Sequence, residues 1–450
     1  MRLTGFLSLV ASSLLLVTAV NSETRPHYGG SLHIALREAP VSLDPGVWND
    51  THGLAGLIFD NLVVIDAEGR AQPALATAWE AEGGNQRWHL TLRRGVAFSD
   101  GTPLTAESVA ALLRAANPDW KVAASQNAVV IERDSPAPNL PAELALPRNC
   151  IVKREGGKIL GTGPYAVAQF EPGRRIALAA REDYWSGRPF LDAIEIELGK
   201  SFREQAILFD LGKAQLIEVA PEQSHGVEAS NRRVENSKPL ELIALVFTRD
   251  AQSPDDVRQR DALSLSIDRN LLNTVVTQGG GEPAGGLLPG WLTGYSFLFP
   301  TEANLMRAQQ ERAEVTHGNL WNLGFDPTDP VARVMAERIV LNARDAGLRL
   351  QLAGANATDV RIQRVPLASL DAQLALEELA RTLKLTPPKF GGQTIEDLYN
   401  MENAELQTKK VIPLLYLRSV SLASEKVKGM QHAGDGSWHL ADAWVMPEKP

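Results

Sequence analysis

Apolar and polar side chains alternate along several short stretches of the chain, which is the pattern of a strand with one buried face. The clearest of these predicted strands lie at residues 31–36, 88–92, 176–180 and 194–198. Elsewhere apolar residues recur three or four positions apart, as at Val109, Leu112 and Leu113, which indicates a helix with one buried face. Because strands and helices mix along the whole chain, we predict an α/β fold.

Several predicted helices begin at residues that suit a helix N-terminus. The predicted N-caps are Thr105, Ser201 and Ser253. Glu204 completes a capping box with Ser201, and Pro254 fits the first position of the third helix. Two further helices are predicted from near Thr51 and, from the leucine spacing, within residues 361–393. The glycine-rich stretch 279–286 is predicted to be a loop.

Length and composition limit the classes to which the protein can belong. The chain has 450 residues, which exceeds a single hydrophobic core, so we expect two or three domains. Its formal net charge is −9, and an acidic chain is a poor partner for nucleic acid or anionic lipid. Cys150 is the single cysteine, so no intramolecular disulfide forms, and we expect a buried thiol without catalytic function.

The N-terminus has the composition of an export signal. Arg2 precedes an apolar run over residues 6–20, which is the length of a signal-peptide core and short for a membrane span. We predict a signal peptide over residues 1–22 with cleavage near Ser22, the alternative being an uncleaved membrane anchor. Removal of Arg2 with that segment changes the charge from −9 to −10. No cysteine follows the apolar run, so we expect a periplasmic protein without a lipid anchor.

One segment, 99–109, combines a tight turn at Asp100-Gly101, a helix-breaking Pro103 and the cap Thr105. Other motifs follow in order: Ser42-Leu43-Asp44-Pro45, Gly161-Thr162-Gly163-Pro164-Tyr165, Asp183-Tyr184-Trp185-Ser186-Gly187-Arg188-Pro189, and Pro289-Gly290-Trp291-Leu292-Thr293-Gly294-Tyr295. Together they resemble the extracellular solute-binding proteins of the peptide and nickel class (family 5), which serve ABC importers. The resemblance is close over residues 30–221 and looser at 257–269, 289–295 and 412–444.

The resemblance implies a two-lobed periplasmic-binding-protein-like fold (type II, large cluster C-like) with an extra inserted subdomain. By that analogy the first lobe comprises residues 27–60, 161–240 and 425–450. The inserted subdomain would be residues 61–160, and the second lobe residues 241–424. Two chain crossings would form a hinge that closes on a ligand. The implied protein is a monomer that binds a small molecule and then an ABC permease at the inner membrane.

Candidate ligand contacts come first from one loop. Trp48, Asn49, Asp50, Thr51 and His52 offer a stacking face with donors and acceptors, and the loop matches the family's cleft segment. The alternative is that Asp50 or Thr51 caps the following helix while Trp48 packs against it.

Four further residues are weaker candidates for contact with the ligand. Arg148 has the donor fork that suits a ligand carboxylate, and it lies where the family's inserted subdomain approaches the cleft. Trp291 and Tyr295 flank a turn in the second lobe, and Trp120 is the last candidate. For each aromatic residue the alternative is simple packing.

Motifs for catalysis or cofactor binding are absent from the sequence. Gly199-Lys200-Ser201 lacks the earlier glycine of a phosphate-binding loop, since that position is Ile194. No Gly-x-Ser-x-Gly elbow occurs, and the histidines show no metal-ligand spacing. We therefore expect neither enzyme activity, nor a cofactor, nor a bound metal.

The ligand class is less well defined than the family. Peptide receptors of the class commonly carry a late aspartate motif that meets the peptide's amino terminus, and residues 361–393 contain no such motif. Short peptides or peptide-like molecules are the first expectation, followed by metal chelates, opines and oligosaccharides. The alternative functions are a periplasmic sensor or folding helper with the same fold, and a secreted hydrolase whose catalytic residues the sequence does not reveal.

Overall fold

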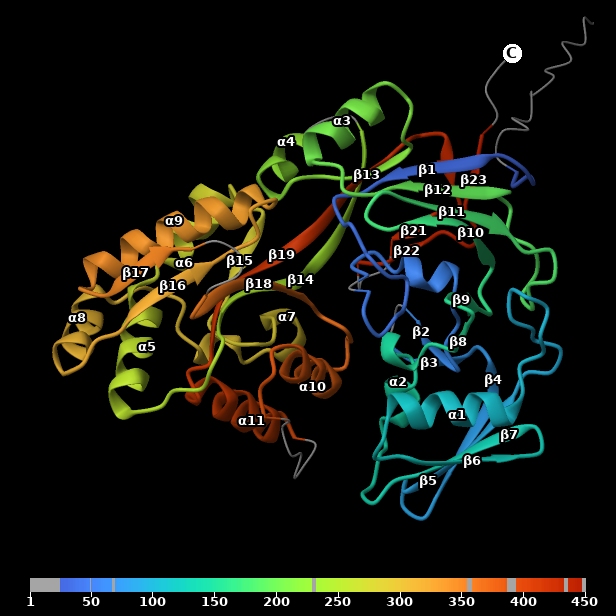
Figure 1. Ribbon diagram of the computed structural model, residues 1–450, viewed down its shortest axis with the longest axis horizontal. Coiled ribbons are helices and arrows are strands. Elements are labelled where there is room, and N and C mark those ends of the chain that lie inside the picture. Colours follow the sequence, from blue (N-terminus) through green and yellow to red (C-terminus); the bar gives the residue numbers. More distant parts are fainter. Residues whose placement is uncertain are drawn as a thin grey trace, which may run out of the picture.

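The computed structural model describes residues 25–48, 50–66, 69–228, 232–353, 358–386, 394–432 and 436–446. Its largest element is an 11-stranded mixed sheet that extends through both lobes (Figure 1). In spatial order the strands are β10 (Tyr165–Glu171), β11 (Arg175–Ala180), β12 (Ala193–Glu197), β1 (Ser31–Ala35), β13 (Leu216–Glu218), β19 (Val411–Ala423), β14 (Arg233–Phe247), β18 (Val360–Pro366), β16 (Leu320–Gly324) and β17 (Arg349–Leu352), with β15 (Gly281–Pro283) paired to β19. We call the part built on β10 to β13 and β1 the first lobe, and the part built on β16 to β18 the second lobe.

Two long antiparallel strands, β14 and β19, connect the lobes. At one end they pair Arg233 with Ala423 beside β13, and at the other end Val246 with Val411 beside β18. Their register shifts between Asn236 and Glu241, which lie between these two ends. Bulged pairing bends and twists strands, so the chain changes direction where it passes from one lobe to the other.

Parallel strands lie on both sides of the β14–β19 connection. In the first lobe β1 runs parallel to both β12 and β13. In the second lobe β16 runs parallel to β17 and β18. The carboxyl ends of these two parallel groups border the site described below.

An inserted subdomain with its own core follows the first strand of the first lobe. It contains an antiparallel sheet in the order β4 (Ala76–Glu82), β5 (Arg87–Leu92), β7 (Ala128–Glu132) and β6 (Lys121–Ser125), packed against α1 (Ala106–Ala116). Its buried side chains form a separate cluster that includes Leu90, Val109 and Ile131. The short hairpins β2 (Val63–Ile65) with β3 (Ala71–Pro73) and β8 (Val152–Glu155) with β9 (Lys158–Gly161), and the helices α2 (Leu140–Glu143) and η3 (Pro147–Asn149), complete it.

The second lobe is a three-layer structure, because helices cover both faces of its sheet. Along β14, Ile243 and Leu245 join a cluster with α5 (Pro254–Ser266), α8 (Leu305–Ala313) and α9 (Pro330–Asp345). Leu242 and Ala244 face the other way, towards α7 (Gly290–Thr293), α10 (Ala372–Thr382) and α11 (Ile395–Gln407). Period-2 burial on both faces is typical of a central strand.

Most of the predicted elements are confirmed. The predicted strands correspond to β1, β5, β11 and β12, and the α/β two-lobed fold class is correct. Thr105 caps α1 in a capping box with Ser108, Ser201 caps α3 (Phe202–Asp210) in a box with Glu204, and Ser253 caps α5. The thiol of Cys150 is buried beside the side chain of Asn61. No helix among the described residues is long and apolar enough to cross a bilayer. The predicted signal peptide lies outside the described residues.

Three local predictions need correction. Residues 361–366, predicted within a helical region, belong to strand β18, and the helix starts only at Ala372. The helix predicted from near Thr51 is a single 3₁₀ turn, η2 (Leu54–Leu57). The glycine-rich stretch contains the short strand β15, in which Gly281 lies so close to β19 that a Cβ would meet the Tyr416 carbonyl at 2.9 Å.

Candidate functional site

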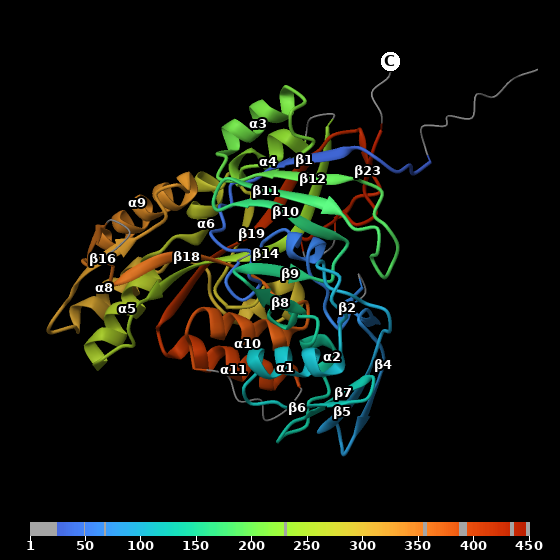
Figure 2. The same cartoon turned by 45° about the vertical axis from the view of Figure 1, so that its right-hand side comes forward.

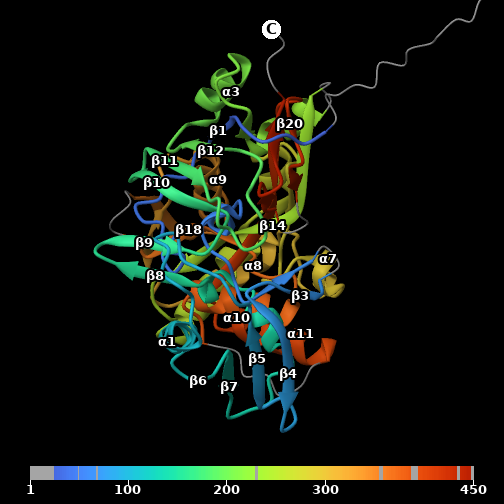
Figure 3. The same ribbon diagram turned by 90° about the vertical axis from the view of Figure 1, so that its right-hand side faces the viewer.

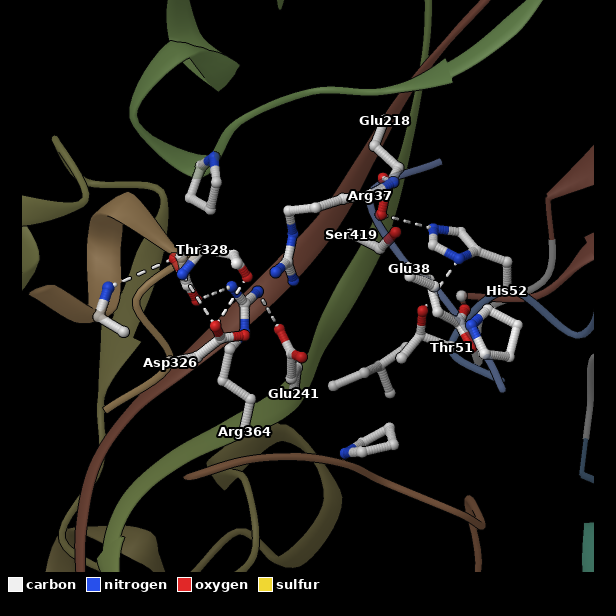
Figure 4. A pocket seen from close by; sticks show the side chains of 18 of the residues that line it. Arg37, Glu38, Thr51, His52, Glu218, Glu241, Asp326, Thr328, Arg364 and Ser419 are labelled. Carbon is white, nitrogen blue, oxygen red and sulfur yellow. Dashed lines mark hydrogen bonds and ion pairs between the residues drawn. The ribbon is translucent and has the colours of Figure 1, made fainter. Parts of the chain in front are cut away.

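A cavity of about 590 Å³ lies between the lobes, where the carboxyl ends of the parallel strands face one another. Arg37 and Glu38 follow β1, Glu218 ends β13, and Asp326 follows β16. Ligands of α/β proteins commonly bind outside the carboxyl ends of the strands. Further lining residues, drawn in part in Figure 4, are Trp48, Thr51, His52, Phe202, Glu241, Thr328, Asp329, Arg364, Arg418 and Ser419.

The first-lobe wall carries carboxyl groups and a histidine. Glu38 accepts a hydrogen bond from the Trp48 indole, and its second oxygen is buried without a partner. His52 is 3% exposed; its Nδ1 lies 2.9 Å from the Thr51 hydroxyl and its Nε2 lies 3.6 Å from a Glu218 oxygen. Polar groups thus converge on one end of the cavity, as they do in small-molecule sites.

Glu38 holds its proton more tightly than an ordinary carboxyl group. Burial raises its pKa to about 8, and the nearby Asp50 adds to the shift, whereas the Trp48 hydrogen bond opposes it. A group with this pKa is mostly neutral at pH 7. Glu38 therefore places little negative charge on the cavity in the absence of ligand.

The opposite wall is built around Arg364 on β18. Its guanidinium donates to Asp329 at 2.8 Å and to Glu241 on β14. Burial acts to lower the pKa of Arg364, but the two carboxylates outweigh it and raise the pKa above its ordinary value. Asp329 also accepts from the backbone amides of Val331 and Ala332, so it caps α9. Arg364, Asp329 and Glu241 therefore hold one another in place by ion pairs within the protein.

Arg37 extends into the cavity between the two walls (Figure 4). Its guanidinium carbon lies 5.8 Å from the centre of the Phe202 ring. Its backbone amide donates to Glu218, whose position is also held by Gln205 at 2.8 Å.

The loop predicted to contact ligand is divided between two roles. Trp48, Thr51 and His52 line the cavity. Asp50 accepts from the backbone amides of His52 and Ala55, so it has the capping role that was the alternative interpretation. Asn49 lies outside the described residues.

The other four predicted residues do not line the cavity. Trp120 is buried in the inserted subdomain, where Arg133 lies over its ring. Trp291 donates to the Pro239 carbonyl at 3.0 Å, and Tyr295 donates to Glu402 at 2.7 Å. Arg148 pairs with Glu143 and with Glu378 of the second lobe, so its donors meet protein carboxylates.

Charged residues of the cavity were missed from the sequence, namely Arg37, Glu38, Glu218, Glu241, Asp326, Asp329, Arg364 and Arg418. A usable signal existed for some of them. Arg37 and Glu38 directly follow a buried strand, and Glu218 interrupts the apolar stretch 216–220. In parallel sheets such positions meet at one edge.

Two of the sequence motifs, 161–165 and 183–189, form structural joints outside the cavity, whereas Ser42 of the first motif lines it. A Cβ on Gly161 would lie 1.9 Å from the Ile58 carbonyl, and one on Gly163 would lie 2.6 Å from the Ile58 carbonyl carbon. Glycine is therefore required where the chain leaves the inserted subdomain. Asp60 accepts from Tyr184 at 3.1 Å and Trp185 at 2.9 Å, which ties the third motif to the same junction.

Comparisons with known proteins agree with this architecture. Residues 70–375 match the family model described as bacterial extracellular solute-binding proteins, family 5 Middle. The glutathione-binding protein GsiB of Salmonella choleraesuis is 27% identical over 277 residues, 55% of this chain and 54% of that protein. The chain thus spans about half the length of such curated relatives.

Two solved structures share the fold. The oligopeptide-binding protein AppA from Bacillus subtilis, in complex with a nonapeptide, has a TM-score of 0.81 at 16% identity, covering 94% of this chain and 100% of that one. NikA from Staphylococcus aureus, in complex with Ni(L-His)2, has a TM-score of 0.75 at 18% identity, covering 92% and 99%. At these identities the likeness concerns the fold.

Proposed function

The chain belongs to the bacterial extracellular solute-binding proteins of family 5, and from this premise we propose that it is the receptor of an ABC importer. It captures a small ligand between its lobes and presents the closed form to a permease at the inner membrane. The family is one of binding proteins, and we propose that this chain makes or breaks no bond in its ligand. We propose further that it is exported to the periplasm and acts as a monomer.

The observation that carries the proposal is a cavity with walls from both lobes. Trp48 and Glu218 belong to the first lobe, whereas Asp329 and Arg364 belong to the second. A ligand in contact with both walls stabilises the closed arrangement, and a permease that distinguishes closed from open then responds to loading. The bulged pairing of β14 with β19 supports a hinge at this place.

The cavity favours a short ligand. A volume of about 590 Å³ is within the usual size of small-molecule sites. We propose a short peptide or peptide-like molecule, in line with relatives named for glutathione and oligopeptides. Metal chelates, opines and oligosaccharides are the competing classes. Trp48, Thr51 and His52 are the residues from the predicted loop that we expect to contact the ligand.

The proposal is tested by thermal unfolding of the chain from residue 23 onward against short peptides, metal chelates, opines and sugars. A ligand at one hundred times its Kd stabilises the folded state by about 2.7 kcal/mol, which raises the melting temperature clearly. For each compound that raises the melting temperature, the next assay asks whether the loaded protein binds the cognate permease and stimulates its ATP hydrolysis. A ligand that binds without any effect on the permease favours the sensor or folding helper instead.

A further inference from the structure

Arg37 has no directly bonded counter-ion within the part of the chain that the structure describes; its nearest contact there is the Phe202 ring at 5.8 Å, and its charge acts on Glu38 and Asp329 only from a distance. Its guanidinium makes neither a hydrogen bond nor an ion pair there, and its Nε is buried without a partner. The side chain is half-buried and directed into the cavity (Figure 4). A partly buried guanidinium gains from a directly bonded anion, and the cavity leaves room for one supplied by a ligand.

The carboxyl groups of the second-lobe wall bond to groups other than Arg37. Asp329 and Glu241 both pair with Arg364. Asp326 accepts from the backbone and hydroxyl of Thr328. None of these carboxylates forms an ion pair with the Arg37 guanidinium among the described residues, although the charge of Arg37 helps to lower the pKa of Asp329 from a distance.

The first-lobe carboxyl groups are not better placed to neutralise Arg37. One Glu218 oxygen is held by Gln205 and by the Arg37 backbone amide, and the other faces His52. Glu38 is mostly neutral at pH 7, because burial raises its pKa to about 8. Arg37 therefore differs from Arg364, whose charge is met by two carboxylates, and from Arg418, which pairs with Glu282.

We propose that Arg37 is the anchor for a carboxylate of the ligand, and that the receptor selects molecules with a free carboxyl group. This inference rests on the proposed receptor function. The guanidinium fork matches the two oxygens of a carboxylate and binds them through parallel hydrogen bonds. Phosphate fits the same fork but is disfavoured, because its second charge would face Glu241, Asp326 and Asp329 across the cavity.

The test compares matched ligands on the wild-type chain and on Arg37→Gln. The panel contains mixed di- and tripeptides with free carboxyl termini, the same peptides amidated, the same peptides N-acetylated, and opines with their methyl esters. Phosphorylated sugars and neutral oligosaccharides complete it. Affinity is measured by calorimetry for every compound that raises the melting temperature. Arg174→Gln is the control, since Arg174 is 81% exposed and contacts Glu171 outside the cavity.

Compounds with free carboxylates are expected to bind, and their amides or esters to bind at least about tenfold more weakly, as expected when a charge-assisted hydrogen bond is lost. Arg37→Gln is expected to abolish that discrimination, Arg37→Lys to restore part of it, and Arg174→Gln to leave it unchanged. Circular dichroism and the ligand-free melting temperature show whether each variant is folded.

Equal binding of acids and their capped forms, or unchanged discrimination in Arg37→Gln, overturns the inference but leaves the receptor function in place. Binding of phosphorylated or neutral sugars, without binding of any free carboxylic acid, likewise overturns the inference and leaves the receptor function in place. A panel in which nothing binds overturns the proposed function and this inference with it.

Discussion

The ion pair between Arg148 and Glu378 joins the inserted subdomain to the second lobe, and its removal is expected to favour the open arrangement. Arg148 lies in η3 and donates to Glu378 on α10 and to Glu143 at 2.7 Å. The two side chains of the inter-lobe pair are 15% and 14% exposed. Figures 2 and 3 show α10 beside the helices of the inserted subdomain.

The size of the expected shift towards the open arrangement follows from the ion pairs that remain after the substitution Arg148→Met. Glu143 keeps its pair with Arg133 and Glu378 keeps Arg381, so neither carboxylate that Arg148 contacts is left without a cation. The loss is then that of a charge-assisted hydrogen bond, for which we take the lower end of the usual range, about 1.5 kcal/mol. Since about 1.4 kcal/mol is a factor of ten, the open-to-closed ratio should rise about tenfold.

The assay is small-angle X-ray scattering of the ligand-free protein, followed by calorimetry with any ligand identified above. Arg148→Met should raise the radius of gyration and weaken ligand binding, although Arg148 does not line the cavity. Arg133→Met is the matched control, because Arg133 pairs with the same Glu143 but makes no contact with α10 among the described residues. Unchanged scattering and affinity in Arg148→Met, or equal changes in both variants, would refute the reasoning.

Three further predictions concern stability and binding. Gly161→Ala should destabilise the fold by about 1 to 3 kcal/mol or prevent folding, since the new Cβ would meet the Ile58 carbonyl at 1.9 Å. Chemical denaturation measures this loss. Gly226→Ala is the control, because a Cβ at Gly226 meets open space. Burial raises the pKa of both Glu377 and Glu402 to about 7, so the folded state holds protons that the unfolded state releases. The stability that these protons contribute at low pH is therefore lost as the pH rises through 7. The melting temperature should fall between about pH 5 and 8. Glu402→Gln should make the melting temperature depend less on pH. Trp48→Phe removes the indole donor to Glu38 and should cost about 1 kcal/mol of stability and weaken ligand binding; a variant with unchanged unfolding and affinity would remove Trp48 from the site.

The local rules of helix capping predicted three caps correctly, at Thr105, Ser201 and Ser253. Ser201 and Glu204 bond to each other across three residues, and so do Thr105 and Ser108. Such contacts need no information about the rest of the fold. The same holds for the strand β5, whose alternating burial is visible in residues 87–92.

The prediction for residues 361–366 failed because two periods occur side by side. Val360, Ile362 and Val365 are the buried positions of β18, whereas the leucines from Leu374 onward follow helical spacing. A window long enough to detect the helix also covers the strand, and the longer signal then dominates. Val360 and Ile362 are β-branched, which is the feature that distinguishes the strand.

The charged residues of the cavity come together only through the fold. Arg37 and Arg364 are separated by more than three hundred positions, and what joins them is the arrangement of parallel strands on either side of β14 and β19. The motifs at 161–165 and 183–189 gave no guide to these positions, because Gly161 and Trp185 hold the junction with the inserted subdomain. A motif that fixes a junction serves the frame of the fold, whereas a cavity residue serves the ligand. A search for charged residues directly after buried parallel strands would therefore find cavity residues that a search for family motifs overlooks.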